Sequence, residues 1–475
     1  MHWTTALDKI REVVGPSGWL DDEAELKPYL TEWRKILQGY CRMLVRPANT
    51  EQTAKVVAIC HQAGIPITPQ GGNTGMVGGA VPKDGILLCT SRMRTIRELD
   101  VDNSTITVEA GTLLAEVQDA ARENGLLFPL SLASEGSCNI GGNIATNAGG
   151  NNTIRYGNMR ELVLGLEIVL PDGQVWNGLR QLRKCNTGYD LKHLFIGSEG
   201  TLGIITAAVL ALTPEPRARF TAMATANNWL DLQKLYNIIN ARLSGAVVAF
   251  EVFPHLGMEI TIRHINNTNS PFDQPYPFYA LIEAVDYGDD AAIRGNLETA
   301  LGEALEANII TDAVLAVSTQ QADNLWRIRE TLPQAQSLEA DVIKHDISVP
   351  VSKIPQYAEQ ATDLAKETIP ACRVLPFGHM GDGNLHFNLL MPEKLDREQY
   401  LAYYTEVNRV LHDLAVNMGG SFSAEHGVGL VKCEEMQRYR STVEMNLMAR
   451  VKSAIDPANG MNPGKIFGPE KVLSN

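Results

Sequence analysis

The 475-residue chain lacks several features that would assign it to common protein classes. No apolar run approaches the roughly 20 residues that cross a bilayer, so we expect no transmembrane segment. The charge is not basic, since 41 Lys and Arg stand against 55 Asp and Glu for a net charge of −14. We therefore expect no nucleic-acid partner, because phosphate contacts need a basic surface. The seven cysteines never form a C-x-x-C pair, which predicts reduced thiols and a cytoplasmic location.

Two familiar phosphate-binding signatures are also missing. Glycine is nevertheless abundant in one segment that could bind phosphate. Residues 69–79 read PQGGNTGMVGG and follow the apolar run 65–68. They contain neither the Gly-Lys-Ser/Thr of a Walker loop nor the G-x-G-x-x-G dinucleotide fingerprint. A plain surface turn would account for one glycine pair, but not for five glycines in nine residues. Unencumbered backbone N–H groups, with Asn73 and Thr74 beside them, predict a phosphate-binding loop.

Two further glycine-rich segments follow, at residues 134–152 and 186–203. The first is poor in large side chains and rich in amides and hydroxyls, a composition suited to lying along a large polar ligand. A disordered linker would have a similar composition. The strand-like run 162–170 and the Pro171-Asp172-Gly173 turn that follow it favour a place inside the fold.

The elements around these segments predict two kinds of domain. A strand at 42–46, a helix from Asn49 or Thr50 to about Gln62, and a strand at Ile65 form a strand–helix–strand unit. The first glycine loop then lies at the carboxyl end of a strand, where ligands often bind. Residues 213–216, Thr-Pro-Glu-Pro, mark a domain boundary. Beyond it, strand-like runs at 220–226, 246–253 and 279–284 alternate with helical spans, which predicts an α+β domain with an antiparallel sheet and helices on one face.

A predicted hairpin in this second half carries two histidines. Strand-like residues flank a turn at 381–384, and centring the hairpin on Asp382-Gly383 pairs His379 with His386. Opposed residues have Cβ atoms roughly 5 Å apart, so both imidazoles could bind one ion. Asn388 shares that face. The alternative is a polar outer face of the sheet.

The third ligand of such a site could come from the glycine-flanked loop at 423–429. Glu425 in that loop would complete a set of two histidines and one carboxylate, which suits Zn²⁺, with Mn²⁺ or Fe²⁺ as alternatives. The adjacent His426 would then be available as a base. Alternatively, Glu425 and His426 form a surface pair.

Together these motifs resemble the FAD-dependent D-2-hydroxyacid dehydrogenases of the vanillyl-alcohol oxidase type, and most closely the hydroxyglutarate dehydrogenases among them. The resemblance rests on residues 69–79, 134–150, 186–206, 378–388, 423–429 and 462–465. It implies an α+β protein with a PCMH-type FAD-binding domain and a substrate domain built on an antiparallel sheet. The implied organisation is an N-terminal helical segment (1–37), the FAD-binding domain (38–215), the substrate and metal domain (216–440) and a C-terminal segment that packs on the FAD domain (441–475).

The resemblance also implies a site for FAD. The first glycine loop would hold the pyrophosphate, residues 134–147 would line the flavin, and a strand at 197–205 would complete the site. The first glycine loop has no histidine for covalent attachment, so the FAD is expected to be non-covalent. The implied flavin-binding residues are Pro69, Gly71, Gly72, Asn73, Thr74, Gly75, Ser134, Gly136, Ser137, Gly141, Asn143, Thr146, Asn147, Gly200, Ile205 and Asn462.

The substrate side of the site follows from the same resemblance. A divalent metal, with zinc expected, would be bound by His379, His386 and Glu425, and Asn388 and His426 would lie beside the substrate. Arg329 matches the family arginine that binds a carboxylate, and Lys344 matches its lysine partner. Without the resemblance, both cations would be interpreted as solvated surface charges.

The implied reaction is oxidation of a D-2-hydroxyacid, D-2-hydroxyglutarate first, to the 2-oxoacid by hydride transfer to FAD. Pro333 stands where the hydroxyglutarate enzymes place a threonine, so D-lactate, D-malate and glycolate remain alternative substrates. An electron-transfer flavoprotein or a quinone is the expected acceptor, and a homodimer is one expected assembly. Two other classes stay open: a flavin-free metal-dependent hydrolase that uses the same histidines and glutamate, and a flavoprotein that only relays electrons.

Overall fold

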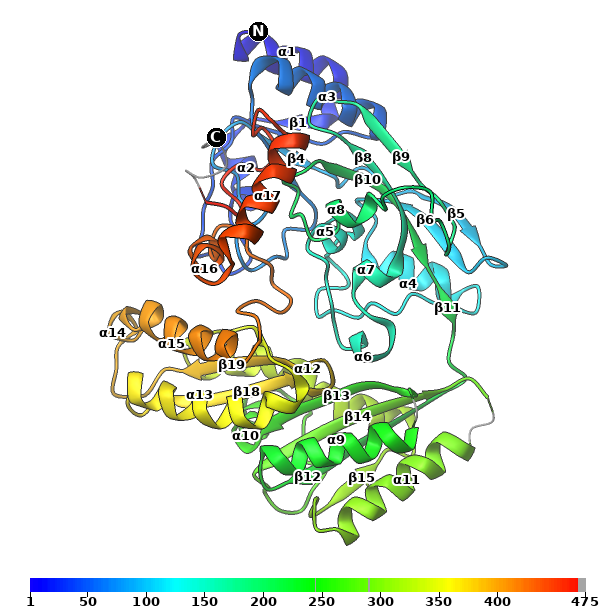
Figure 1. Ribbon diagram of the computed structural model, residues 1–475, viewed down its shortest axis with the longest axis vertical. Coiled ribbons are helices and arrows are strands. Elements are labelled where there is room, and N and C mark those ends of the chain that lie inside the picture. Colours follow the sequence, from blue (N-terminus) through cyan, green and yellow to red (C-terminus); the bar gives the residue numbers. More distant parts are fainter. Residues whose placement is uncertain (244, 289–290, 469–475) are drawn as a thin grey trace. The chain divides into compact units, whose positions relative to one another are not determined.

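The computed structural model describes residues 1–243, 245–288 and 291–468, and the chain divides into two compact units (Figure 1). The first unit contains residues 1–150, 157–215 and the segment from Glu425 onward, and the second contains residues 151–156 and 216–424. The C-terminal segment thus belongs with the N-terminal half of the chain, although residues 469–475 of the expected segment lie outside the described residues. Among the described residues, no helix has the length and apolar character needed to cross a membrane.

The first unit opens with helix α1 (Trp3–Val14) and a four-stranded sheet of order β1-β2-β4-β3. Its strands are β1 (Trp19–Leu20), β2 (Met43–Val45), β3 (Ile67–Gln70) and β4 (Ile86–Cys89), of which β2, β4 and β3 run parallel. Helix α3 (Thr50–Ala63) connects β2 to β3. Asn49 caps it by accepting the Gln52 N–H at 2.9 Å, and Gly64 ends it with a left-handed φ of 64°. The predicted strand–helix–strand unit is therefore confirmed, with the glycine loop directly after β3.

The second sheet of the first unit is antiparallel and has the order β5-β6-β10-β8-β9. Its strands are β5 (Ile96–Asp100), β6 (Thr105–Glu109), β8 (Val163–Val169), β9 (Val175–Gly178) and β10 (Ile204–Ala211), with a separate pair β7 (Leu126–Leu127) and β11 (Thr213–Pro214). The expected strand at 197–205 was wrong over most of its length, because residues 197–203 form a loop and β10 begins at Ile204. Glu199 and Gly200 have φ values of 51° and 71°, which an extended strand does not allow.

Short helices and the C-terminal segment complete the first unit. The helices are α2 (Glu23–Leu30), α4 (Leu114–Arg122), α5 (Ile140–Ala145), α7 (Met159–Leu162), α8 (Lys192–Phe195), α16 (Cys433–Tyr439) and α17 (Thr442–Ile455). Lys452 of α17 is buried and donates to the carbonyl oxygens of Thr201 at 2.7 Å and Met461 at 2.9 Å, and it also pairs with Asp456. This buried cation fastens the C-terminal helix to the loop before β10.

The second unit is built on an eight-stranded sheet, and its register is antiparallel throughout, as predicted. The order is β15-β12-β14-β13-β18-β19-β16, with β17 also paired to β19. The strands are β12 (Ala218–Ala226), β13 (Val247–Pro254), β14 (Phe278–Asp286), β15 (Ala313–Leu315), β16 (Val342–Ile343), β17 (Ile347–Ser348), β18 (Arg373–His379) and β19 (Asn384–Leu390).

Helices cover both faces of this sheet, so the expectation of helices on one face was wrong (Figure 1). One face carries α9 (Trp229–Leu243), α11 (Ala291–Glu306), α13 (Ile354–Thr368) and α15 (Tyr404–Asn417), and the other carries α10 (His255–His264) and α12 (Thr319–Glu339). The short helices α6 (Thr153–Tyr156) and α14 (Arg397–Ala402) also belong to this unit. Helices cover both faces because the central strands of the sheet are apolar on both sides. Phe250 and Val252 of β13 pack on the first face, and Phe253 packs on the second.

Candidate active site

The three glycine-rich segments of the first unit line one cleft. Of the predicted flavin residues, those that line it are Pro69, Gly71, Gly72, Asn73, Thr74, Gly75, Gly141, Asn143, Thr146, Gly200 and Ile205. His426, from the returning C-terminal segment, lines the same cleft. Thus three separate stretches of the first half and one residue of the last fifty come together around a single cavity.

Close backbone packing explains why glycine is required at some of these positions. A Cβ on Gly72 would lie 2.0 Å from the carbonyl oxygen of Ser137, and one on Gly200 would lie 2.3 Å from Cγ of Pro69. At Gly75 and Gly142, by contrast, a Cβ would meet nothing within 4 Å. The first pair of glycines lets the loops approach each other, and the second pair leaves open space along the cleft wall. An extended, phosphate-bearing cofactor such as FAD fits such a cradle.

Five predicted flavin residues do not line the cleft: Ser134, Gly136, Ser137, Asn147 and Asn462. At least three of them brace its walls instead. The Ser134 carbonyl accepts the N–H of Cys138 at 2.8 Å, and Asn147 Oδ1 accepts the N–H of Arg160 at 2.9 Å. Asn462 donates to the carbonyl oxygens of Gly79 and Glu199.

Glu199 is a site residue that the sequence patterns did not single out. It is 9% exposed and lines the cleft, and its carboxylate accepts the N–H groups of Val428 at 2.8 Å and Gly429 at 2.7 Å. Burial raises the pKa of Glu199, while the two backbone donors act in the opposite direction. Through these bonds the loop before β10 holds the loop that carries His426. The only local indication was a single carboxylate enclosed by glycines in Gly197-Ser198-Glu199-Gly200.

In the second unit, the register of the histidine hairpin differs from the predicted one. His386 of β19 pairs with Phe377 of β18, not with His379. The turn is longer than two residues, because a 3₁₀ turn at Met380–Asp382 precedes Gly383, whose φ is 87°. The shift is by two residues, so the side chains stay on the predicted face. The two imidazole centroids still lie only 5.7 Å apart.

A buried carboxylate orients the first histidine. Oε1 of Glu251, on β13, lies 2.6 Å from Nδ1 of His379, and Oε2 accepts from Nε of Arg329 at 2.7 Å. Burial opposes ionisation of Glu251, but Arg329 and His379 outweigh it and hold its pKa at about 2. An ionised carboxylate can only accept, so Nδ1 of His379 carries a proton and donates it to Glu251. Glu251 was absent from the sequence-based site because nothing local distinguishes it in an apolar strand.

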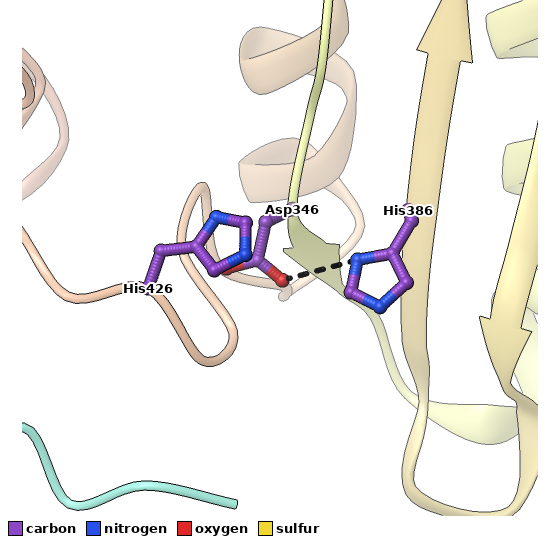
Figure 2. Close-up of side chains that lie close together, drawn as sticks. All are labelled: Asp346, His386 and His426. Atoms are coloured by element: carbon purple, nitrogen blue, oxygen red, sulfur yellow. Dashed lines mark ion pairs between the residues drawn. The ribbon is translucent and has the colours of Figure 1, made fainter. Parts of the chain in front are cut away.

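A second carboxylate, Asp346, accompanies the other histidine. Asp346 Oδ1 lies 3.8 Å from Nδ1 of His386. The dashed line in Figure 2 marks this pair. Asp346 is 2% exposed, and its two oxygens accept hydrogen bonds from the Asn384 amide at 3.0 Å and the Ala424 N–H at 3.2 Å. Each imidazole therefore has a carboxylate near Nδ1, an arrangement that directs Nε2 toward a metal in many proteins. The histidine pair and its carboxylates fit a borderline-soft divalent cation.

The remaining predicted substrate residues lie on the same part of the sheet. Asn388 of β19 is 2% exposed; its Oδ1 accepts the His345 N–H at 3.2 Å, and its Nδ2 donates to Gln336 at 3.0 Å. These bonds fix its amide within the fold. Lys344 precedes His345 and lies between β16 and β17, which both pair with β19.

The turn between β18 and β19 contains a further carboxyl group, that of Asp382. Burial raises the pKa of Asp382 to about 6, although His379 opposes the shift.

Comparison with known proteins gives the family. Residues 41–178 match the family described as "FAD binding domain", and residues 215–466 match "FAD linked oxidases, C-terminal domain". The chain belongs to the FAD-linked oxidase family. Its relatives include a D-2-hydroxyglutarate dehydrogenase of Xanthomonas citri pv. viticola, 36% identical over 457 residues that cover 96% of this chain and 95% of the relative. A probable mitochondrial D-2-hydroxyglutarate dehydrogenase of Oryza sativa subsp. japonica is also 36% identical, over 98% of this chain and 81% of its own length.

Two solved structures share the fold of this chain. The chain of p-cresol methylhydroxylase with substrate bound superposes with a TM-score of 0.78 at 17% identity, covering 98% of this chain and 97% of that one. Alkyldihydroxyacetonephosphate synthase gives a TM-score of 0.73 at 18% identity, covering 99% of this chain and 85% of that one. The predicted α+β fold with a PCMH-type FAD-binding domain is confirmed, as is FAD as the cofactor.

Proposed function

We propose that this FAD-linked oxidase is a dehydrogenase that oxidises a D-2-hydroxyacid, with D-2-hydroxyglutarate as the first candidate substrate. The D-2-hydroxyglutarate dehydrogenases from plants and bacteria that match nearly the whole chain support this assignment. The side-chain chemistry supports it as well. The first unit offers a glycine-lined cofactor cleft, and the second offers a histidine pair beside a buried arginine.

The observation that carries the proposal is the path of the chain from Ala424 to His426. The Ala424 N–H is bonded to Asp346, next to the histidine pair, and His426 lines the flavin cleft. Two residues of extended chain span at most about 7 Å. Covalent connectivity therefore keeps the ligand candidate Glu425 and the base candidate His426 within two residues of Ala424, whose N–H is bonded to Asp346.

In this proposal each residue has a defined task. FAD supplies the hydride acceptor when bound, and a divalent metal, zinc as first candidate, supplies a positive charge for the hydroxyl oxygen. The residues that would hold the metal are His379, His386 and Glu425. An imidazole nitrogen of His426 accepts the hydroxyl proton.

The substrate carboxylates would be oriented by two cations. Arg329 and Lys344 do this by charge-assisted hydrogen bonds, and Asn388 fixes the strand that carries His386. The glycine segments would hold the pyrophosphate and line the flavin without a covalent bond.

The decisive experiment is anaerobic reduction of the purified yellow protein by a panel of 2-hydroxyacids. We expect D-2-hydroxyglutarate to bleach the flavin absorbance and its L enantiomer to leave it unchanged. Prior treatment with a chelator should slow the bleaching, and added Zn²⁺ should restore it. Bleaching by neither enantiomer of any acid in the panel would refute the dehydrogenase, and bleaching that a chelator does not affect would refute the metal.

One residue favours a second substrate class. Pro333 lies one turn after Arg329 in α12 and offers no hydroxyl for a distal carboxylate. D-Lactate, D-malate and glycolate therefore belong in the panel.

The acceptor, assembly and location form the last part of the proposal. We propose an electron-transfer flavoprotein or a quinone as the acceptor, to be tested by reoxidation of the reduced flavin in stopped flow. A homodimer is proposed as the assembly and is tested by light scattering. The seven cysteines form no disulfide among the described residues, and six of them are buried, which supports a reducing, cytoplasm-like compartment. Several relatives are named mitochondrial. Fractionation of the source cells tests the proposed location.

A further inference from the structure

The carboxylate of Glu251 joins two candidate active-site residues that are otherwise distant in the sequence. His379 is 128 residues away and Arg329 is 78 residues away. Glu251 is fully buried, Arg329 is 6% exposed and His379 is 4% exposed. Solvent therefore cannot replace either of the two bonds that Glu251 accepts.

The fold places these three groups together by strand pairing and helix packing. Glu251 on β13 stands directly opposite His379 on β18. Helix α12 packs on the same face and brings Arg329 to the other carboxylate oxygen. The Arg329 guanidinium also lies 5.0 Å from the centroid of Phe377, the residue that pairs with His386. One carboxylate and one aromatic ring thus determine where the arginine lies.

We propose that Glu251 is a positioning residue that keeps Nε2 of His379 available to a metal and holds Arg329 toward a substrate carboxylate. This inference rests on the proposed function, because it assigns His379 and Arg329 the roles given there. Its consequence is that one side chain couples metal binding to substrate binding.

The chemistry of the two bonds supports this role. A carboxylate has no proton to donate, so Nδ1 of His379 must carry a hydrogen, and in the neutral imidazole the lone pair is then on Nε2, where a metal can bind it. Glu251 accepts from Nε of Arg329, which leaves the two terminal NH₂ groups of the guanidinium for a bidentate partner. Neither bond alone would produce both effects.

The test is the isosteric variant Glu251→Gln. A glutamine amide has one acceptor and one donor end, and the permanently charged Arg329 takes the acceptor. The NH₂ group then faces Nδ1 of His379, which must become an acceptor, so the proton moves to Nε2. We expect the affinity for Zn²⁺ to fall roughly 10- to 100-fold, the range typical when a residue that orients a ligand is replaced.

A matched control is available on the neighbouring strand. Glu283 of β14 is also buried and faces the same helix α12, accepting from Trp326 at 2.6 Å and from Arg219 at 3.0 Å. It has no bond to either site residue among the hydrogen bonds of the described chain. Glu283→Gln should therefore leave the Zn²⁺ affinity unchanged.

The measurement is competition for Zn²⁺ with a chromogenic chelator, on flavin-loaded protein first stripped of metal. Equal affinity in wild type and Glu251→Gln would overturn the role of Glu251 and leave the proposed function intact. A wild type that binds no Zn²⁺ would overturn the metal assignment and this inference together.

A second measurement needs no mutation of Glu251. In metal-free wild type labelled with ¹⁵N-histidine, at a pH high enough for the ring to be neutral, the ring nitrogens of His379, assigned with His379→Asn, should show protonated Nδ1 and unprotonated Nε2. The opposite tautomer would overturn the inference even if Glu251→Gln fails to fold.

Discussion

At the scale of single residues, buried partners decide which polar groups are available for chemistry. Arg329 would be a surface cation by its residue type alone, yet it is 6% exposed and paired with Glu251. His426 gains its place because Glu199 holds the two residues that follow its neighbour Gly427. In both cases a glutamate from a distant segment of the chain holds the functional candidate in place.

The role of His426 as base can be tested by kinetics. We expect His426→Ala to lower kcat by about 10²- to 10⁴-fold, the usual contribution of general base catalysis, while the flavin spectrum stays normal. His61→Ala, at an exposed position of α3, serves as the control. Turnover within a few-fold of wild type would remove His426 from the mechanism.

Pro333 offers a test of substrate specificity. It lies inside α12 and has no N–H to donate to the carbonyl of Arg329. Pro333→Ala and Pro333→Thr both restore that donor, but only threonine adds a hydroxyl. If a hydroxyl there binds a distal carboxylate, KM for D-2-hydroxyglutarate should be about 10-fold lower in Pro333→Thr than in Pro333→Ala, the value of one hydrogen bond to a charge. Equal KM values in the two variants would show that position 333 does not read the second carboxylate.

At the scale of elements, loops and helix ends hold the site in place. The glycine loop after β3 packs against the backbone of the second glycine segment, and α12 ends in a cluster of charges around Glu339. These contacts are local in space but remote in sequence, and each allows a matched pair of variants.

Two glycines of the first loop should respond very differently to alanine. In Gly72→Ala the new Cβ would lie 2.0 Å from the Ser137 carbonyl oxygen. In Gly75→Ala the new Cβ would meet no atom of another segment within 4 Å. We expect Gly72→Ala to lower the Tm of flavin-free protein by several degrees and Gly75→Ala to leave it unchanged. Loss of flavin from Gly75→Ala with an unchanged Tm would additionally place the cofactor at that position. Equal Tm values for Gly72→Ala and wild type would contradict the packing of the two segments.

The end of α12 predicts an acid-sensitive contribution to stability. Hydrogen bonds from Arg373 and His264, with Arg263 beside them, hold the pKa of Glu339 at about 2. A glutamate in the unfolded chain has a pKa of roughly 4.3. The stabilisation of the fold by the charged Glu339 is therefore complete above that pH and is lost as the pH falls toward 2.

We therefore expect Glu339→Gln to lower the free energy of unfolding by about 1–2 kcal/mol at pH 7, a value discounted because the arginines are partly solvated. The difference from wild type should shrink steadily below pH 4.5 in urea titrations. Glu359→Gln, at an exposed position of α13, is the control. A difference that stays constant down to pH 3 would show that Glu339 does not contribute through its charge.

At the scale of the whole molecule, the chain leaves the first unit and returns to it. Residues from Glu425 onward belong with the N-terminal half, so the flavin cleft includes a residue from the far end of the sequence. Buried polar bonds, not only apolar contacts, hold this returning segment. Lys465 donates to the Val81 carbonyl, and burial lowers its pKa to about 8.

The buried Lys452–Asp456 ion pair should contribute strongly to holding the C-terminal segment in the first unit. Lys452→Met leaves Asp456, 1% exposed, without its cation, and we expect a loss of about 3–5 kcal/mol in the free energy of unfolding. The double variant Lys452→Met/Asp456→Asn should recover part of the loss, because no uncompensated charge remains. Urea unfolding of wild type, Lys452→Met, Asp456→Asn and the double variant measures this coupling, and additive effects of the two changes would contradict it.

The sequence by itself determined the features that depend on local chemistry. Glycine density identified three of the segments that line the cleft, capping residues located α3, and alternation placed His379 and His386 on one face of a sheet even though the register was wrong by two residues. Resemblance to a family identified the cofactor and the reaction class.

Only the tertiary structure decided which carboxylates serve these groups. Glu251 meets His379 across 128 residues, Glu199 meets Gly429 across 230, and the sheet of the second unit is covered on both faces. Such partners are chosen by strand pairing and helix packing between distant segments, and no local pattern distinguishes a glutamate that will be buried beside a histidine from one that will face solvent.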